Sequence, residues 1–204
     1  MKTLSQEDLN KITPKMALSL LKKGNIRFID NLKKHQNLIE QVVATSTGQF
    51  PFGVILGCVD SRVPVELIFD EGIGDLFSVR IAGNIVNDDI LASLEYACEV
   101  IGSKIILVLG HTDCGAIKAA CDNVSIGNIP KLVQKIKPAI NKVSCDKKIE
   151  EQGLMDLVAM ENVNNSIEEI RKRSTILRTL EQKGKIDIVG AMYCVNTGVV
   201  TFYE

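Results

Sequence analysis

The sequence predicts an α/β protein with a mostly parallel central sheet, flanking helices, an N-terminal helical arm and a C-terminal edge strand. Three short apolar runs, at 52–58, 76–83 and 104–111, have the length and composition of strands buried in a parallel sheet. Segments with helical character separate these runs, and strands that alternate with helices form parallel sheets with right-handed crossovers. The three runs and their spacing therefore define the fold class.

Residues 1–45 form the predicted arm, because their apolar residues recur at helical spacing. Thr13 suits the N-cap of a helix and Pro14 suits the first helical position. Gly24 and Asn25 predict a break that divides the arm in two. A compact sheet domain does not need the apolar face of such an arm, so we expect it to lie across a neighbouring subunit in a two-fold dimer.

Residues 46–204 form the predicted α/β domain, and no linker separates a second one. The short turn around 196–198 is compatible with a hairpin, so the last strand is expected at an antiparallel edge. In chain order we expect a strand at 52–58, a helical segment at 63–72, a strand at 76–83, a helix from Asp88 to Ile101 with Asp and Asn caps, a strand at 104–111, a helix from Gly115, mostly helical structure at 130–183 with breaks at Pro130 and Pro138, and paired strands at 185–196 and 198–204.

The charge balance favours small-molecule chemistry. The chain has 24 Lys and Arg against 25 Asp and Glu, which gives no long-range attraction to nucleic acid or to anionic lipid. No run approaches the roughly 18 apolar residues of a membrane span, and the N-terminus lacks the apolar core of a secretory signal. We therefore expect a cytoplasmic protein with a small-molecule substrate and neither a nucleic-acid nor a membrane partner.

The six cysteines include no CxxC pair and resemble neither a disulfide framework nor a thiol redox centre. Most are expected to be reduced thiols. Four of them we interpret as packing residues: Cys98, Cys121, Cys145 and Cys194.

The remaining two cysteines belong to a predicted metal site. Cys58 and His111 each follow an apolar run and a glycine, in ILGC and VLGH. The carboxyl ends of parallel strands share one edge of the sheet, so these two side chains can meet there. Cys114 stands three residues after His111, at the expected start of a helix. Two cysteines and one histidine with an open fourth position are typical of a catalytic zinc site, so we expect one Zn²⁺ per chain.

Asp60 and Arg62 alternate with Cys58 along CVDSRV. In an extended segment this spacing turns all three side chains toward one side. An ordinary ion pair is the simplest reading of an Asp and an Arg two residues apart. Their place directly after a metal ligand instead indicates that they act at the metal site.

The motif CxDSRxP followed by HxxCG resembles the β-class carbonic anhydrases. The similarity extends from GQFPFGVILGCVDSRVPVELIFDEGIGDLFSVRIAGN through ASLEYACEVIGSKIILVLGHTDCGAIKAA to the C-terminal strands. The resemblance implies that Cys58, His111 and Cys114 bind zinc and that residues 46–204 are a zinc-binding catalytic domain. It also implies a homodimer or homotetramer whose active sites draw on two chains.

The implied reaction is the reversible hydration of carbon dioxide to bicarbonate and a proton by zinc-bound hydroxide. Asp60 would accept a hydrogen bond from that hydroxide, and Arg62 would hold Asp60 away from the metal. Gln49, in a QxP setting before the first cysteine ligand, would stabilise the charge that develops on the substrate oxygen. The resemblance assigns four further residues to the substrate pocket: Phe77, Ala82, Tyr96 and Gly115, with Ala82 replacing a Val found in many members.

Other metal-free and metal-dependent classes do not fit the sequence. A dinucleotide-binding loop is excluded because GIGDLF has Phe77 in place of its third glycine. A phosphate-binding loop is excluded because GHTDCGAIK has Ala116 directly after the second glycine, where that loop needs Lys. A zinc deaminase would need the motifs HxE and PCxxC, which the sequence lacks. Two alternatives stay open. One is a hydrolase of carbon disulfide or carbonyl sulfide, and the other is a catalytically silent, zinc-stabilised interaction protein in which Asp60 closes the site as fourth ligand.

Overall fold

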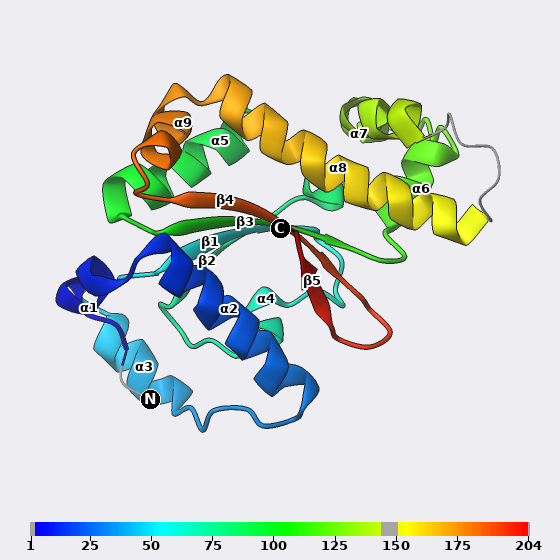
Figure 1. Cartoon of the computed structure of the whole chain (residues 1–204). Coiled ribbons are helices and arrows are strands. Elements are labelled where there is room, and N and C mark those ends of the chain that lie inside the picture. The colour runs from blue at the N-terminus through cyan, green and yellow to red at the C-terminus, as the bar shows by residue number, and fades with distance from the viewer. Residues whose placement is uncertain (1–2, 144–150, 204) are drawn as a thin grey trace.

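The computed structural model describes residues 3–143 and 151–203. In Figure 1 the sheet is seen nearly edge-on, with α1 to α4 below it and α5, α8 and α9 above it. The strands are β1 (Gly53–Gly57), β2 (Leu76–Arg80), β3 (Ile105–His111), β4 (Asp187–Tyr193) and β5 (Val200–Phe202). The helices are α1 (Gln6–Lys11), α2 (Pro14–Ile29), α3 (Leu38–Thr45), α4 (Val65–Ile68), α5 (Asp88–Glu95), α6 (Gly115–Cys121), α7 (Ile129–Val143), α8 (Glu151–Arg173) and α9 (Thr175–Gln182), with a 3₁₀ turn at Ala82–Asn84 and a π-helical segment at Tyr96–Ile101.

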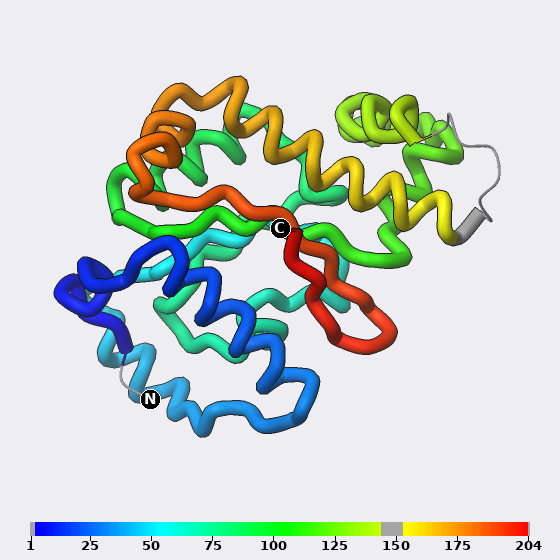
Figure 2. Tube along the Cα trace, viewed as in Figure 1, coloured from blue at the N-terminus to red at the C-terminus, as the bar shows by residue number. Residues whose placement is uncertain are grey.

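The sheet confirms the predicted fold class. Its strand order is β2-β1-β3-β4-β5. The first four strands are parallel, and β5 pairs antiparallel with β4 at the edge. In the path of the chain in Figure 2 the last two strands join through the expected short turn. β1 pairs with β3 in a register that sets Gly57 opposite Leu109, so both strands end at the same edge of the sheet. We call the end of the sheet formed by the carboxyl ends of β1, β2 and β3 the metal edge; it differs from the two outer edges of the sheet, which are the strands β2 and β5.

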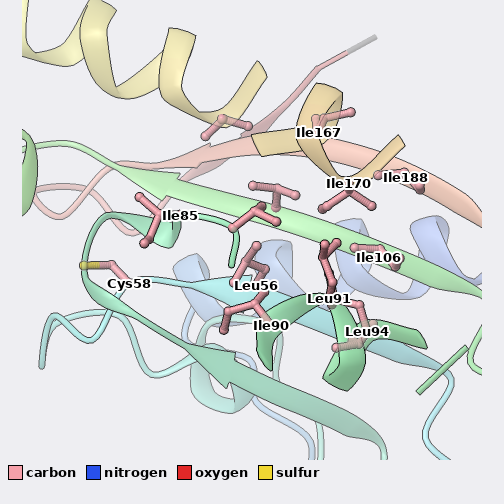
Figure 3. Packing of buried hydrophobic residues seen from close by; sticks show 14 of the residues in the cluster. Leu56, Cys58, Ile85, Ile90, Leu91, Leu94, Ile106, Ile167, Ile170 and Ile188 are labelled. Carbon is pink, nitrogen blue, oxygen red and sulfur yellow. The ribbon is translucent and has the colours of Figure 1, made fainter. Parts of the chain in front are cut away.

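The sheet divides the interior into two cores, because successive side chains of a strand point to opposite faces. Val54 and Leu56 of β1 face the layer of α5 to α9, whereas Ile55 faces α1, α2 and α4. Figure 3 shows part of the first core, with the sulfur of Cys58 at its margin beyond the row of aliphatic side chains. Apolar packing on both faces therefore holds the strand that leads directly into Cys58.

The first two helices pack against the sheet of their own chain, so the premise that the sheet domain does not need the apolar face of the arm is wrong for α1 and α2. A contact of the arm with a neighbouring subunit stays a prediction. Leu9, Ala17 and Leu21 are fully buried in the core beneath the sheet of their own chain. Within the arm, α3 carries the largest number of exposed apolar side chains, of which Ile39 and Val43 are 74% and 68% exposed. A boundary at residue 45 stays a prediction.

The predicted break at Gly24 and Asn25 is wrong, since α2 runs through both residues. A Cβ on Gly24 would lie 1.8 Å from the carbonyl oxygen of Phe69, so glycine is there to let α2 approach the chain after α4. Asn25 is buried, and its side chain makes three hydrogen bonds. Its amide donates to the carbonyls of Ile68 and Gly198, and its oxygen accepts from the N–H of Val200.

The predicted breaks at Pro130 and Pro138 are also wrong, because α7 contains both prolines. Pro130 lies in the first turn, where a backbone N–H has no partner within the helix. Pro138 removes one hydrogen bond inside α7, but the neighbouring Ile136 and Ala139 are fully buried and keep the helix packed. No helix within the described ranges, 3–143 and 151–203, has the length and apolar character of a membrane span.

Gly24→Ala tests the close approach of α2. Helix propensity alone predicts a gain of about 1 kcal/mol in the free energy of unfolding for this change. The clash with Phe69 predicts a loss of about 1 to 3 kcal/mol instead. Denaturant unfolding measures the difference, with Lys23→Ala, an exposed position on the same helix, as the matched control. A more stable Gly24→Ala protein would contradict the contact.

Candidate metal centre

Three side chains that could bind a metal meet at the metal edge. Cys58 directly follows β1, His111 ends β3, and Cys114 caps the start of α6. Their ligand atoms all lie within 4.8 Å of one another, and all three residues are buried. The structure thus brings together the two residues that the strand-end pattern predicts, Cys58 and His111, and the Cys114 that the HxxC spacing adds to them.

The histidine has the orientation that a metal ligand needs. Its Nδ1 lies 2.8 Å from the carbonyl oxygen of Thr112, which accepts the Nδ1 proton. The Nε2 atom is then left with a lone pair, and it is buried without a hydrogen-bond partner. A buried nitrogen of this kind next to two sulfurs fits a borderline-soft ion such as zinc.

The two thiols strongly affect each other. The pKa of Cys58 is lowered below that of an ordinary thiol, first because Cys114 shares a hydrogen bond with it; burial opposes this effect, and His111 and the N–H of Gly83 add to it. The pKa of Cys114 is raised, first by the same hydrogen bond and then by burial. One sulfur is therefore readily ionised while the second resists ionisation until a cation joins them.

Asp60 and Arg62 form an ion pair beside the cage. Arg62 Nε and Nη2 each donate to a different carboxylate oxygen of Asp60 at 2.9 Å, and Nη2 also donates to the carbonyl of Asp113 at 3.1 Å. The Arg62 hydrogen bond lowers the pKa of Asp60 to about 2. Both oxygens of Asp60 are thus engaged by Arg62, and the carboxylate stays ionised at neutral pH.

The route to this pairing differs from the predicted one. The chain after Cys58 is not extended but turns at 60–63, where the N–H of Val63 donates to the Asp60 carbonyl and the N–H of Arg62 donates to the Asp60 side chain. The two residues meet because a short polar side chain closes the turn on its own backbone. The sequence therefore predicted correctly that Asp60 and Arg62 lie together, but a turn brings them together and not an extended segment.

Two further residues that the sequence did not single out support the first cysteine. Arg80, at the end of β2, donates to the carbonyls of Cys58 and Asp60 at 2.9 and 2.5 Å. The N–H of Gly83 donates to the sulfur of Cys58 at 3.3 Å. Arg80 stands at the carboxyl end of a predicted parallel strand, so the strand-end rule that found the ligands could have indicated it.

The remaining predicted residues fall into two groups. Ala82 and Gly115 lie near the cage, in the 3₁₀ turn and at the start of α6, and open space adjoins the Cα of Gly115. Gln49 is exposed and precedes β1, at the opposite end of that strand from Cys58. Phe77 pairs with Val54 near the same opposite end, and its ring meets that of Tyr96 edge-on with centroids 6.3 Å apart.

Comparison with known proteins agrees with this geometry. The family described as carbonic anhydrase matches residues 53–200. A carbonic anhydrase of Mycolicibacterium smegmatis is 34% identical over 196 residues, which cover 92% of each chain. Among solved structures, a Coccomyxa β-carbonic anhydrase in complex with acetazolamide has a TM-score of 0.73 at 25% identity, covering 91% of this chain and 85% of the other.

A tetrameric β-carbonic anhydrase of Sordaria macrospora has the same fold. Its TM-score is 0.70 at 24% identity, with 77% of this chain and 82% of the other covered. The family match covers well over half of this chain, and the Mycolicibacterium relative matches it along 92% of that protein's length. With its parallel sheet and its cysteine–histidine–cysteine group, the chain belongs to the β-class carbonic anhydrases.

Proposed function

We propose that this chain binds one zinc ion through Cys58, His111 and Cys114 and catalyses the reversible hydration of carbon dioxide to bicarbonate and a proton. The observation that carries the proposal is the three-donor cage from which Asp60 is held away by Arg62. Three protein donors leave one tetrahedral position open, as catalytic zinc sites require. The thiolate ligands need reduced cysteines, which suits a cytoplasmic enzyme.

A zinc ion held by Cys58, His111 and Cys114 would supply a nucleophile near neutral pH by lowering the pKa of a coordinated water. The chain supplies the orientation. Asp60 is ionised and accepts hydrogen bonds only, so it can accept one from a group at the open position and aim that group at the substrate. Arg62 keeps the carboxylate in place from one side, and through the Asp113 carbonyl it also contacts the loop between His111 and Cys114.

The pocket needs a second copy of the chain. Gln49 and Phe77 lie at the amino ends of the strands, whereas the cage lies at the metal edge. The five residues of β1 span about 16 Å at about 3.3 Å each, which is too far for Gln49 to touch a substrate at the cage of its own chain. If the Gln49 amide stabilises the substrate oxygen, it must do so in a partner.

The free edge of β2 shows how such a partner could sit. β2 pairs with β1 on one side and forms the outer edge of the sheet on the other. A two-fold axis at that edge would run two β2 strands antiparallel, which brings the amino end of one sheet toward the metal edge of the other. The exposed apolar face of α3, with Leu38, Ile39 and Val43, would be covered in the same contact. We therefore propose a homodimer as the catalytic unit, and pairing of two dimers would give a tetramer.

The two open alternatives are less well supported. A silent zinc protein needs Asp60 as a fourth ligand, but both of its oxygens bond Arg62. Hydrolysis of carbon disulfide or carbonyl sulfide would use the same cage, so assays with these gases belong beside the carbon dioxide assay.

Changing the ligands should remove the metal. Cys58→Ser and Cys114→Ser should each lose most of the zinc and carbon dioxide hydration, because serine is a poor zinc ligand at neutral pH. Elemental analysis of purified protein and stopped-flow hydration measure the two effects. Cys121→Ser, outside the cage on the same helix α6, should keep about one zinc per chain. Full zinc content in either ligand variant would contradict the assignment.

Breaking the ion pair should remove activity but not metal. Asp60→Asn and Arg62→Ala should lower the hydration rate by about 10- to 100-fold, as loss of groups that orient metal ligands does. Both variants should retain zinc, since neither residue belongs to the cage. Stopped-flow rates normalised to zinc content test this. An Arg62→Ala protein with the wild-type rate would show the pair to be a surface ion pair only.

Mixed dimers test the shared site. Gln49→Leu and Asp60→Asn should each be nearly inactive as homodimers, with at least a tenfold loss. In a heterodimer of the two, one site combines an intact Asp60 with an intact Gln49 from the partner, and the other site lacks both. Tandem-tag purification of that heterodimer should recover about half the wild-type rate. If Gln49 acted within its own chain, neither site would be complete and no rate would return.

A further inference from the structure

The sulfur of Cys58 accepts a hydrogen bond from a turn that follows β2. The donor is the N–H of Gly83, at 3.3 Å from Sγ and buried. Gly83 and Asn84 both have left-handed backbone conformations, with φ of 69° and 41°. A non-glycine residue rarely adopts such a conformation unless its surroundings hold it there. The position of the donor therefore depends on what anchors this turn.

The anchors come from α8, far along the chain. The Asn162 Nδ2 donates to the carbonyl of Gly83 at 2.7 Å, and the Ser166 hydroxyl donates to the carbonyl of Asn84 at 3.0 Å. Asn162 and Ser166 are one helical turn apart, and their exposed fractions are only 2% and 4%. Each satisfies a buried carbonyl that the turn itself leaves without a partner.

Side chains of α6 and α7 also restrict the turn, because they pack closely against Gly83. A Cβ on Gly83 would lie 2.9 Å from Cδ1 of Ile136 and 3.3 Å from Cβ of Ala116. Helices α6 and α7 thus press on the same residue whose carbonyl Asn162 holds. Asn162 is the member of this arrangement that bonds directly to the residue donating to the sulfur.

We propose that Asn162 is a positioning residue of the metal centre, which fixes the Gly83 N–H on the sulfur of Cys58. The inference rests on the proposed zinc site. Asn162 holds the carbonyl of Gly83, the turn keeps its left-handed shape, and the N–H stays aimed at Sγ. A hydrogen bond to a metal-bound thiolate withdraws charge from sulfur and fixes its direction, as outer groups do at other metal sites.

Cadmium NMR tests the hydrogen bond in the unaltered protein. The chain is labelled with ¹⁵N and loaded with ¹¹³Cd, which takes sulfur ligands as zinc does. The Gly83 amide proton should show a scalar coupling to ¹¹³Cd across the N–H···S bond. A bound cadmium ion coupled to the cysteine Hβ protons but not to the Gly83 amide would overturn the proposal.

Substitution tests the part played by Asn162. Asn162→Ala should release metal to a chelator about tenfold faster than the wild type. In the Co²⁺-loaded protein its thiolate-to-metal absorption band should move to longer wavelength, because sulfur regains charge. Asn162→Leu repeats the test with a side chain of similar size, in case the smaller residue disturbs folding.

Ser103→Ala is the matched control. Ser103 is equally buried and donates to the carbonyl of Pro51 at 2.8 Å, but it precedes β3, at the other end from His111. It should lose thermal stability while its metal release and cobalt band stay at wild-type values. Asn162 variants that behave like Ser103→Ala would reduce Asn162 to a structural residue and overturn the inference.

The same measurements separate this inference from the proposed function. If the wild-type chain binds no metal and gives no cobalt–thiolate band, the zinc site itself is wrong. If the wild type binds metal and hydrates carbon dioxide while the Asn162 variants leave release rate and band unchanged, only the role of Asn162 is wrong.

Discussion

The parallel pairing of β1 with β3 is the interaction on which the metal centre depends. It sets Gly57 opposite Leu109, so the two strands end together and Cys58 comes beside His111. Aliphatic side chains on both faces hold the register, since a slip of one residue would turn each buried side chain toward the other layer. The positions of the two sulfurs are therefore set largely by the apolar packing around the strands and helix that carry them, a core to which Cys58 and Cys114 also belong.

Electrostatics then determine what this edge of the sheet can hold. Two buried thiols cannot both ionise side by side without a cation, which is why the pKa of Cys58 is low while that of Cys114 is raised. A divalent ion relieves that conflict. Arg62 has the complementary effect on Asp60, whose carboxylate would otherwise be free to approach the same ion. The ion pair and the cage together favour a site with one open position.

A single chain builds only part of this site. The groups that would hold and activate the metal lie at the carboxyl ends of the strands, whereas Gln49, Phe77 and Tyr96 lie toward the amino ends. The free edge of β2 and the apolar face of α3 lie outside the two cores. The proposed enzyme therefore needs a dimer for catalysis, because the length of β1 separates Gln49 from the cage of its own chain.

The sequence by itself determined the α/β class, the strand ends and the three candidate metal ligands, because strand runs, caps such as Thr13 and the order of residues along a strand are local properties. The tertiary structure alone decided the features that rest on distant contacts. Gly24 continues a helix because Phe69 needs the space, and Asn162 reaches the turn at Gly83 across many residues. Such contacts leave no periodicity in the sequence, since each depends on which surfaces the folded sheet and helices bring together.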